Sequence, residues 1–160
     1  MNPVGQLTTE QVARAQVVAE ARSWVGTPYV LRGRVKSAGA DCFTFIAEVM
    51  IACGLFNSEE LPVYNHDWWA HCSDEQYAFR LMRYATNIFE GVAYTSTEVL
   101  PGTILVQRMA GSRVYNHGAI VTAWPLIVHC LSPCVEEVNA SRDPTWSYQT
   151  VAAFDPWRKP

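Results

Sequence analysis

The sequence predicts one α+β domain, with N-terminal helices packed on one face of a C-terminal antiparallel sheet. The chain has 160 residues, the length of about one domain, and neither a repeat nor a Gly/Ser-rich linker divides residues 1–160. Apolar residues recur at helical spacing in the first half. After Pro101 and Gly102 the pattern changes to short apolar runs separated by turn residues, which is typical of strands.

The first predicted helix begins at a capping box. Thr8 and Gln11 have the spacing at which each side chain can bond to the other's backbone N–H. Apolar residues then recur every three or four positions, namely Val12, Ala15, Val18, Ala21 and Val25. The segment Gly-Thr-Pro-Tyr (26–29) ends this helix, and a polar loop follows over residues 32–40.

Two more helices are expected before the strands. Residues 42–53 are almost wholly apolar and Gly54 follows them, which predicts a buried helix that ends at a glycine. A loop rich in proline, asparagine and aromatic residues covers 56–71. Ser73 and Gln76 form a second capping-box pattern, and the helix that they open should end at Gly91. Its apolar positions are Leu81, Met82, Ala85, Ile88 and Phe89.

The second half predicts strands at 103–109, 118–123 and 126–131. The last two are joined by a tight turn at Trp124-Pro125. Residues 135–138 and 149–154 are expected to add two further strands.

Composition and charge exclude several classes of protein. The net charge is −3 and lysine and arginine form no local cluster, which argues against nucleic-acid binding. The apolar runs are too short and interrupted for a membrane span, and the N-terminal segment lacks the basic and apolar regions of a signal peptide. The odd number of cysteines, five, indicates reduced thiols rather than a disulfide framework.

Cys42 is the candidate nucleophile. Cysteine catalysis needs a thiolate, a base and a group that orients the base, and the dipole at a helix N-terminus favours a thiolate. Among the five cysteines, Cys42 alone stands where a polar loop turns into an apolar helix, whereas Cys53 lies at the far end of that helix. The alternative is an ordinary core residue, the commoner role of a cysteine in an apolar helix.

His117 and His129 are expected at the same end of neighbouring strands. A hairpin that turns at Trp124-Pro125 pairs residues 118–123 with 126–131. Opposite Cβ atoms in such a pair lie about 5 Å apart, so the two imidazoles can meet. A base and its orienting group on adjacent strands suit a cysteine nucleophile. The alternative is that both are buried strand histidines without a chemical role.

Five segments together resemble the NlpC-type papain-like peptidases, which hydrolyse bacterial cell-wall peptides. They are ARSWVGTPY (21–29), GADCFTF (39–45), LPGTILVQ (100–107), NHGAIV (116–121) and LIVHCLS (126–132), and they span about 110 of the 160 residues. Their order and approximate spacing are those of the family. A further segment, LPVYNHDWWAH (61–71), is similar to compact single-domain versions among phage tail and phage cell-wall peptidases.

The resemblance implies a papain-like fold and roles for five residues. Cys42 corresponds to the nucleophile, His117 to the general base, and His129 to the polar residue that orients the base. Tyr29 corresponds to a tyrosine beside the nucleophile, and Asp41 to an acid that in relatives can recognise the free amino end of the peptide. The backbone N–H of Cys42 would serve in the oxyanion hole.

The reaction that the resemblance implies is hydrolysis of an amide bond in peptidoglycan stem peptides, between γ-D-glutamate and a diamino acid. No cofactor is implied. Where relatives commonly have Ser-Gly after the nucleophile, this chain has Phe43 and Thr44. This departure puts the usual substrate contacts in question.

A metal site is a competing hypothesis for the cysteines and histidines. Zinc requires four ligands in a tetrahedral array. Two groups of candidates stand close in the sequence, namely His66, His71 and Cys72, and His129, Cys130 and Cys134. The pair Cys130 and Cys134 fits zinc spacing loosely, but His129 and Cys130 are neighbours on a strand and point to opposite faces. We therefore expect no bound metal.

Two further hypotheses keep the papain-like fold but change its function. One is a structural module of a phage tail tip with little activity, in which some of the six tryptophans and seven tyrosines supply contact surface. The second is an acyltransferase that uses the same three residues. The resemblance to phage enzymes predicts synthesis in the host cytoplasm, a place in the virion tail, and tail-hub proteins as partners. The acidic balance gives no attraction to the anionic wall, which favours delivery by a larger assembly.

Overall fold

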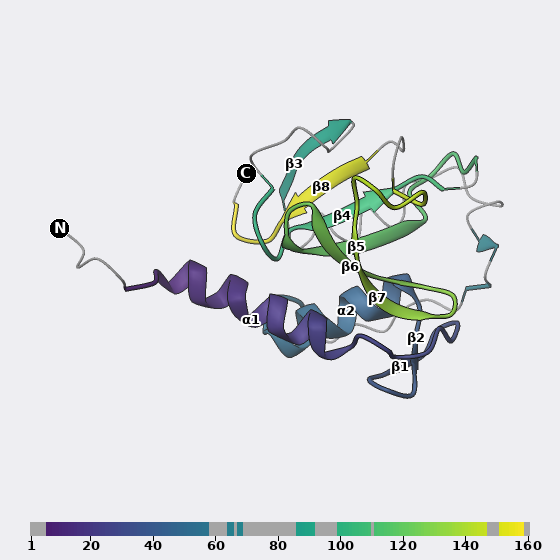
Figure 1. Ribbon diagram of the computed structural model, residues 1–160, viewed down its shortest axis with the longest axis horizontal. Helices are drawn as coiled ribbons and strands as arrows, with labels where there is room; N and C mark the ends of the chain where they lie inside the picture. Colours follow the sequence, from purple (N-terminus) through teal and green to yellow (C-terminus); the bar gives the residue numbers. More distant parts are fainter. Residues whose placement is uncertain are drawn as a thin grey trace.

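The fold is described by a computed structural model for residues 6–57, 64–65, 67–68, 86–91, 99–109, 111–146 and 151–158. The α+β class is confirmed: helices α1 (Thr9–Ser23) and α2 (Cys42–Ala52) lie together on one side of an antiparallel sheet (Figure 1). The predicted capping box of Thr8 and Gln11 is present at the start of α1. Within the described segments, neither helix has the length and apolar character needed to span a membrane.

The sheet has the strand order β3-β8-β4-β5-β6-β7. Its strands are β3 (Thr86–Gly91), β4 (Ile104–Gln107), β5 (His117–Ala123), β6 (Leu126–Leu131), β7 (Cys134–Asn139) and β8 (Val151–Asp155). The last five lie where strands are predicted, with ends shifted by a few residues. The loop predicted at 32–40 contains a two-stranded ribbon, β1 (Arg34–Val35) and β2 (Gly39–Ala40).

Both faces of strands β4, β5, β6 and β8 are buried, which explains why these strands read as nearly continuous apolar runs. On the helix side, Val17 of α1 and Phe45 of α2 belong to the same core cluster as Ile120 of β5. On the opposite side, Leu105, Ala119 and Val121 pack in a second cluster with Trp146. Because side chains alternate along a strand, consecutive residues of β5 enter different clusters.

The prediction of a helix that ends at Gly91 is wrong over the last residues of that helix. Residues 86–91 form β3, which pairs antiparallel with β8 from Thr86 opposite Asp155 to Gly91 opposite Val151. Pairing with another strand overrides helix-like apolar spacing, because the preference of a short segment depends on its tertiary neighbours. Residues 73–85, where the pattern predicts the start of this helix, lie outside the described residues, as does most of the predicted loop 56–71.

The apolar face predicted for α1 is also wrong in part. Val12 and Val25 are exposed, whereas the buried residues of the helix are Arg14, Val17 and Ala21. Val17 and Ala21 contribute to the helix-side core. A buried arginine therefore occupies a position that the apolar pattern did not include.

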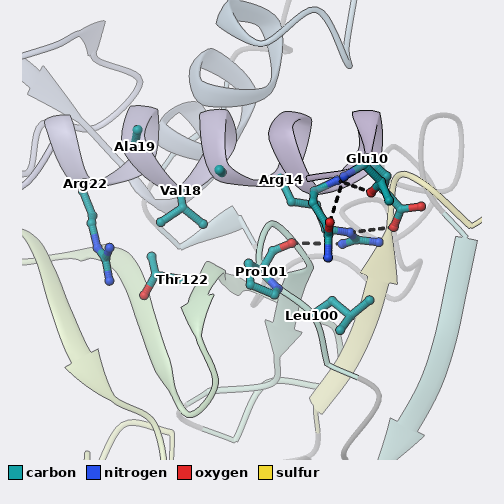
Figure 2. Close-up of a pocket in the computed structure, with 11 residues that line it drawn as sticks. Glu10, Arg14, Val18, Ala19, Arg22, Leu100, Pro101 and Thr122 are labelled. Atoms are coloured by element: carbon teal, nitrogen blue, oxygen red, sulfur yellow. Dashed lines mark hydrogen bonds and ion pairs between the residues drawn. The ribbon is translucent and has the colours of Figure 1, made fainter. Parts of the chain in front are cut away.

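Arg14 is buried because Asp155 at the end of β8 pairs with it. Its guanidinium donates two hydrogen bonds to that carboxylate, at 3.0 and 2.8 Å, and the Asp155 side chain is 0% exposed. It also donates to the carbonyl oxygen of Pro101 at 2.9 Å and to Glu10 at 2.8 Å, and Figure 2 shows these two contacts beside α1. The indole ring of Trp157 stacks 4.3 Å from the guanidinium carbon. Arg14 thus fixes α1 to the sheet.

Substitution of Arg14 by methionine should destabilise the fold by about 3–5 kcal/mol, because it leaves the buried Asp155 carboxylate with only the longer ion pair to the half-exposed Arg158, at 3.7 Å. Urea unfolding followed by circular dichroism measures this change. Adding Asp155→Asn to the Arg14→Met variant should recover part of the loss by removing the charge. The control is Arg22→Met, since Arg22 pairs with Glu137 at 3.0 Å while 46% exposed, and a pair of this kind contributes about 1 kcal/mol or less. Equal losses in the two arginine variants would contradict the prediction.

Candidate active site

Asp41 and the residues after it position Cys42 at the first turn of α2. The Asp41 carboxylate accepts hydrogen bonds from the backbone N–H groups of Phe43 and Thr44, both at 2.9 Å. The Thr44 hydroxyl accepts from the Asp41 N–H at 2.9 Å, which completes a capping box. The cap uses the second and third N–H groups of the helix, so the Cys42 N–H is left outside it.

The Cys42 thiol lies against the beginning of β5. Its sulfur is 3.7 Å from the carbonyl oxygen of Asn116, to which the thiol donates. The backbone N–H of Gly118 is also directed at the sulfur. These two residues flank His117, so the fold brings the candidate nucleophile to the strand segment that carries the candidate base.

Burial raises the pKa of the Cys42 thiol above its ordinary value, and the negative charge of Asp41 acts in the same direction. The backbone N–H groups of Gly118 and Cys42 lower this pKa by a smaller amount. The sequence predicts that the helix N-terminus favours a thiolate, but in this structure burial and Asp41 outweigh that effect. Cys42 is therefore a neutral thiol at rest.

His117 and His129 meet across β5 and β6. His117 Nε2 lies 2.9 Å from His129 Nδ1, and both residues are buried. The register places Ala119 opposite His129, so His117 is offset from it by two residues on the same face. Burial lowers the pKa of His117 to about 3, helped by His129. Burial also lowers the pKa of His129, although Asp143 and Glu136 oppose this. Both imidazoles are neutral at pH 7.

Trp146 determines where the protons lie on these two rings. Its indole N–H, which can only donate, is 3.1 Å from His129 Nδ1. His129 Nδ1 is therefore an acceptor, and His117 Nε2, which faces the same atom, carries a hydrogen, so the two donors share the one lone pair of Nδ1. The proton of His129 is then on Nε2, 3.4 Å from an oxygen of Glu136. His117 Nδ1 is left with its lone pair, as a general base requires.

Replacing Trp146 by phenylalanine should release this proton arrangement, because the ring remains while the N–H donor is lost. We expect the ¹⁵N spectrum of the imidazoles to change from one tautomer of His129 to a mixture. Leaving this buried acceptor without its donor should lower the free energy of unfolding by about 1–3 kcal/mol. The matched control is Trp24→Phe, since the Trp24 indole donates to Glu20 instead. Unchanged imidazole signals in Trp146→Phe would contradict the assignment.

The pKa shifts predict how Cys42 reacts with iodoacetamide. Because the pKa of the thiol is raised and that of His117 is lowered, no thiolate–imidazolium pair exists near neutral pH. The alkylation rate should rise about tenfold per pH unit from pH 5 to 8, as expected below the pKa of a thiol. Peptide mapping by mass spectrometry separates Cys42 from the other cysteines.

A variant tests the cause of this pH dependence. Asp41→Asn removes the negative charge but retains a residue that caps helices well, so it should move the profile to lower pH. A fast, pH-independent alkylation of Cys42 between pH 5 and 7 would instead reveal a preformed ion pair.

Tyr29 and Asp41, the remaining predicted site residues, lie beside Cys42. The backbone of Tyr29 pairs with that of Ala40, the residue before Asp41. Burial raises the pKa of Tyr29 to about 12, and the charge of Asp41 adds to this effect. Asp41 is 3% exposed and caps α2. The five predicted residues thus gather where the start of α2 meets the ends of β5 and β6.

The described part of the chain does not support the metal hypothesis. Within it, no three His, Cys, Asp or Glu side chains are arranged to hold an ion. His129 faces Trp146, whereas the Cys130 sulfur lies on the other side of the sheet, 3.1 Å from the carbonyl oxygen of Ala40. The other candidates, His66, His71 and Cys72, lie outside the described residues.

A surface pocket is present elsewhere on the molecule. It lies between α1 and the turn before β4, and Figure 2 shows Val18 and Ala19 of the helix together with Leu100, Pro101 and Thr122 around it. None of the five predicted site residues lines this pocket.

Two residues that shape the site were missed in the sequence. Trp146 contacts His129, and the Tyr64 hydroxyl donates to Asp41 at 2.6 Å. Both stand in segments without helical or strand periodicity. Tyr64 is part of LPVYNHDWWAH (61–71), so its aromatic content was visible, but nothing in the pattern paired it with Asp41.

The fold of the chain is that of NlpC/p60 domains. The NlpC/p60 domain of the peptidoglycan hydrolase SagA aligns with 87% of this chain and 96% of its own at 18% identity, with a TM-score of 0.53. A lipoprotein-like protein of the NLP/P60 family from Staphylococcus aureus aligns with 99% of this chain and 45% of its own (16% identity, TM-score 0.58). NlpC2 from Trichomonas vaginalis aligns with 96% of this chain and 51% of its own (13% identity, TM-score 0.63).

The alignment with SagA shows that the chain spans nearly one whole NlpC/p60 domain, and the remaining two alignments show that it spans about half of those longer chains. No protein-family model matches the sequence, and no curated protein matches it. The likeness is therefore one of fold.

Proposed function

We propose, from the NlpC/p60 fold of this chain and the residues at its site, that the protein is a cysteine peptidase that hydrolyses peptidoglycan stem peptides. The proposal rests mainly on the 2.9 Å contact between His117 and His129 at the strand end that Cys42 touches. A neutral imidazole on the residue between the two that contact the thiol, Asn116 and Gly118, is a suitable arrangement for general-base catalysis. One of the matched folds belongs to a peptidoglycan hydrolase.

In the acylation step, Cys42 Sγ attacks the carbonyl carbon of the scissile amide while its proton passes to His117 Nδ1. His129 accepts the hydrogen bond of His117 Nε2–H and stabilises the imidazolium that forms. The Cys42 N–H, outside the Asp41 cap, stabilises the developing oxyanion. The C–N bond then breaks, His117 protonates the leaving amine, and a thioester remains on Cys42.

In the deacylation step, a water molecule attacks the thioester and gives its proton to His117 Nδ1. The C–S bond breaks, the carboxylic acid product leaves, and the proton returns to the sulfur. His117 begins and ends the cycle neutral, which agrees with its low pKa at rest. We further propose that the bond cleaved joins γ-D-glutamate to a diamino acid, as the sequence resemblance implies.

Defined stem peptides, incubated with the protein and analysed by mass spectrometry, test this function. We expect cleavage after D-glutamate, and Cys42→Ala should reduce it by several orders of magnitude because the nucleophile is removed. The control is Cys53→Ala at the other end of α2, which should retain activity. A folded wild-type protein that cleaves no stem peptide under reducing conditions would favour a structural role, and transfer to an added amine would identify an acyltransferase.

We also propose that a larger assembly, such as a phage tail with its hub proteins, delivers the protein to the wall. The segment LPVYNHDWWAH (61–71) and the net charge of −3 support this proposal. We expect the isolated protein to cleave soluble stem peptides much faster than intact walls. Equal activity on both substrates would contradict delivery by an assembly.

A further inference from the structure

The groove beside α1 has the features of a surface that pairs with a second copy of itself. We propose that two copies of this chain form a symmetric dimer, in which α1 of each copy lies antiparallel along the groove of the other. The groove runs between α1 and the turn before β4, and none of the five candidate site residues lines it. Dimer formation is therefore independent of whether the protein is a peptidase.

The centre of the groove is apolar. Figure 2 shows Val18 of α1 directed towards the turn that carries Leu100 and Pro101. Leu100 is 38% exposed, although it is a large apolar side chain. Removing such surface from water favours association. A helix that lay in the groove would cover Val18 and both residues of the turn.

The outer side of α1 carries small residues that let a second helix approach. Ala15 and Ala19 are exposed and stand four residues apart, so they lie one above the other on the helix surface. Val12, which is 43% exposed, continues the same side three residues before Ala15. Packed helices have axes about 8–10 Å apart, and the shorter distances need small side chains at the contact. The two alanines therefore allow the helices to cross closely.

Opposite charges stand at the two ends of the groove. Figure 2 shows Glu10 near the N-terminal end of α1 and Arg22 near its C-terminal end, with Val18 between them. The helix rises about 18 Å from residue 10 to residue 22. When two such helices run antiparallel, the acidic end of each meets the basic end of the other. A two-fold axis produces this match twice.

Both charged groups keep atoms with which a second copy can bond. Glu10 accepts from Arg14 through Oε1, and within the described residues its Oε2 forms no hydrogen bond. Arg22 donates to Glu137 through Nε, and in the same part of the chain its two terminal nitrogens form none. The two side chains are 50% and 46% exposed. Because a guanidinium has five N–H donors, Arg22 can bind a second carboxylate without losing Glu137.

The order of these features selects α1 of a second copy as the occupant. The groove presents an acidic end, an apolar centre and a basic end, and an antiparallel α1 presents the same features in the reverse order. Contacts limited to one helix and one turn from each copy make a small interface, below about 1,200 Å². We therefore expect a weak dimer, with a dissociation constant on the order of 10 µM.

Sedimentation equilibrium of the full chain under reducing conditions, from about 1 to about 200 µM, covers this dissociation constant. We expect the wild-type protein to change from monomer to dimer over this range. Ala19→Glu places a larger, charged side chain where the helices cross and should weaken association about tenfold or more. Glutamate is a good helix former, so this variant should fold. A wild-type protein that is monomeric throughout would leave the groove to a different partner and would overturn the proposal.

Charge reversal tests the pairing of Glu10 with Arg22. Glu10→Lys and Arg22→Glu should each weaken association about tenfold or more, because like charges then face each other at both ends. An equimolar mixture of the two variants should recover wild-type association to within about threefold, since every facing pair is again of opposite sign. The matched control is Arg142→Glu, an exposed residue between β7 and Trp146 that does not line the groove. It changes the net charge as Arg22→Glu does and should leave association unaltered.

Circular dichroism first establishes that each variant is folded. A mixture of folded single variants that stays monomeric would contradict the proposed pairing, and so would equal weakening by Arg142→Glu. If a single variant does not fold, the double variant Glu10→Lys with Arg22→Glu provides the same test, because it restores both pairs with their charges exchanged. We expect this double variant to form a dimer, and a folded but monomeric double variant would also overturn the proposal.

Discussion

The capping of α2 by Asp41 is the interaction on which the site depends. One carboxylate ends the loop that contains β1 and β2, begins the helix, and draws in Tyr64. Because Cys42 follows directly, its sulfur has a fixed place against β5. The same carboxylate disfavours the thiolate through its charge. Placement and activation of the nucleophile are therefore in conflict at Asp41, and the stable arrangement at rest is the neutral one.

The imidazole pair is organised from the other face of the sheet. His117 and His129 pack with Trp146 in the cluster that the helices do not reach, while Cys42 comes from the helix side. The sheet thus lies between Trp146, which sets the protons, and the helix that carries the thiol, and Cys42 contacts the residues that flank His117 at the beginning of β5.

The sequence could predict those features that depend on local pattern. Cys42 at a helix start and His117 beside His129 on a hairpin follow from caps, periodicity and a turn, and the structure places these residues as the pattern indicates. The resemblance supplied the papain-like architecture, which the fold comparison confirms. The chemical roles of these residues remain predictions. Contacts between segments that are far apart in the sequence leave no local pattern of this kind, so they could not be predicted. The strand at 86–91 depends on pairing with β8, and the buried side of α1 depends on Asp155, which is 141 residues from Arg14.

The position of β8 in the sheet has a consequence for how the molecule is made. This strand is the last of those described along the chain, yet it lies between β3 and β4 in the interior of the sheet. It also carries the carboxylate that anchors α1. During synthesis on a ribosome, the first helix emerges long before its anchor, and the sheet stays divided until β8 inserts. Contacts so distant in sequence close late, so the nascent protein must be kept from aggregating for most of its translation.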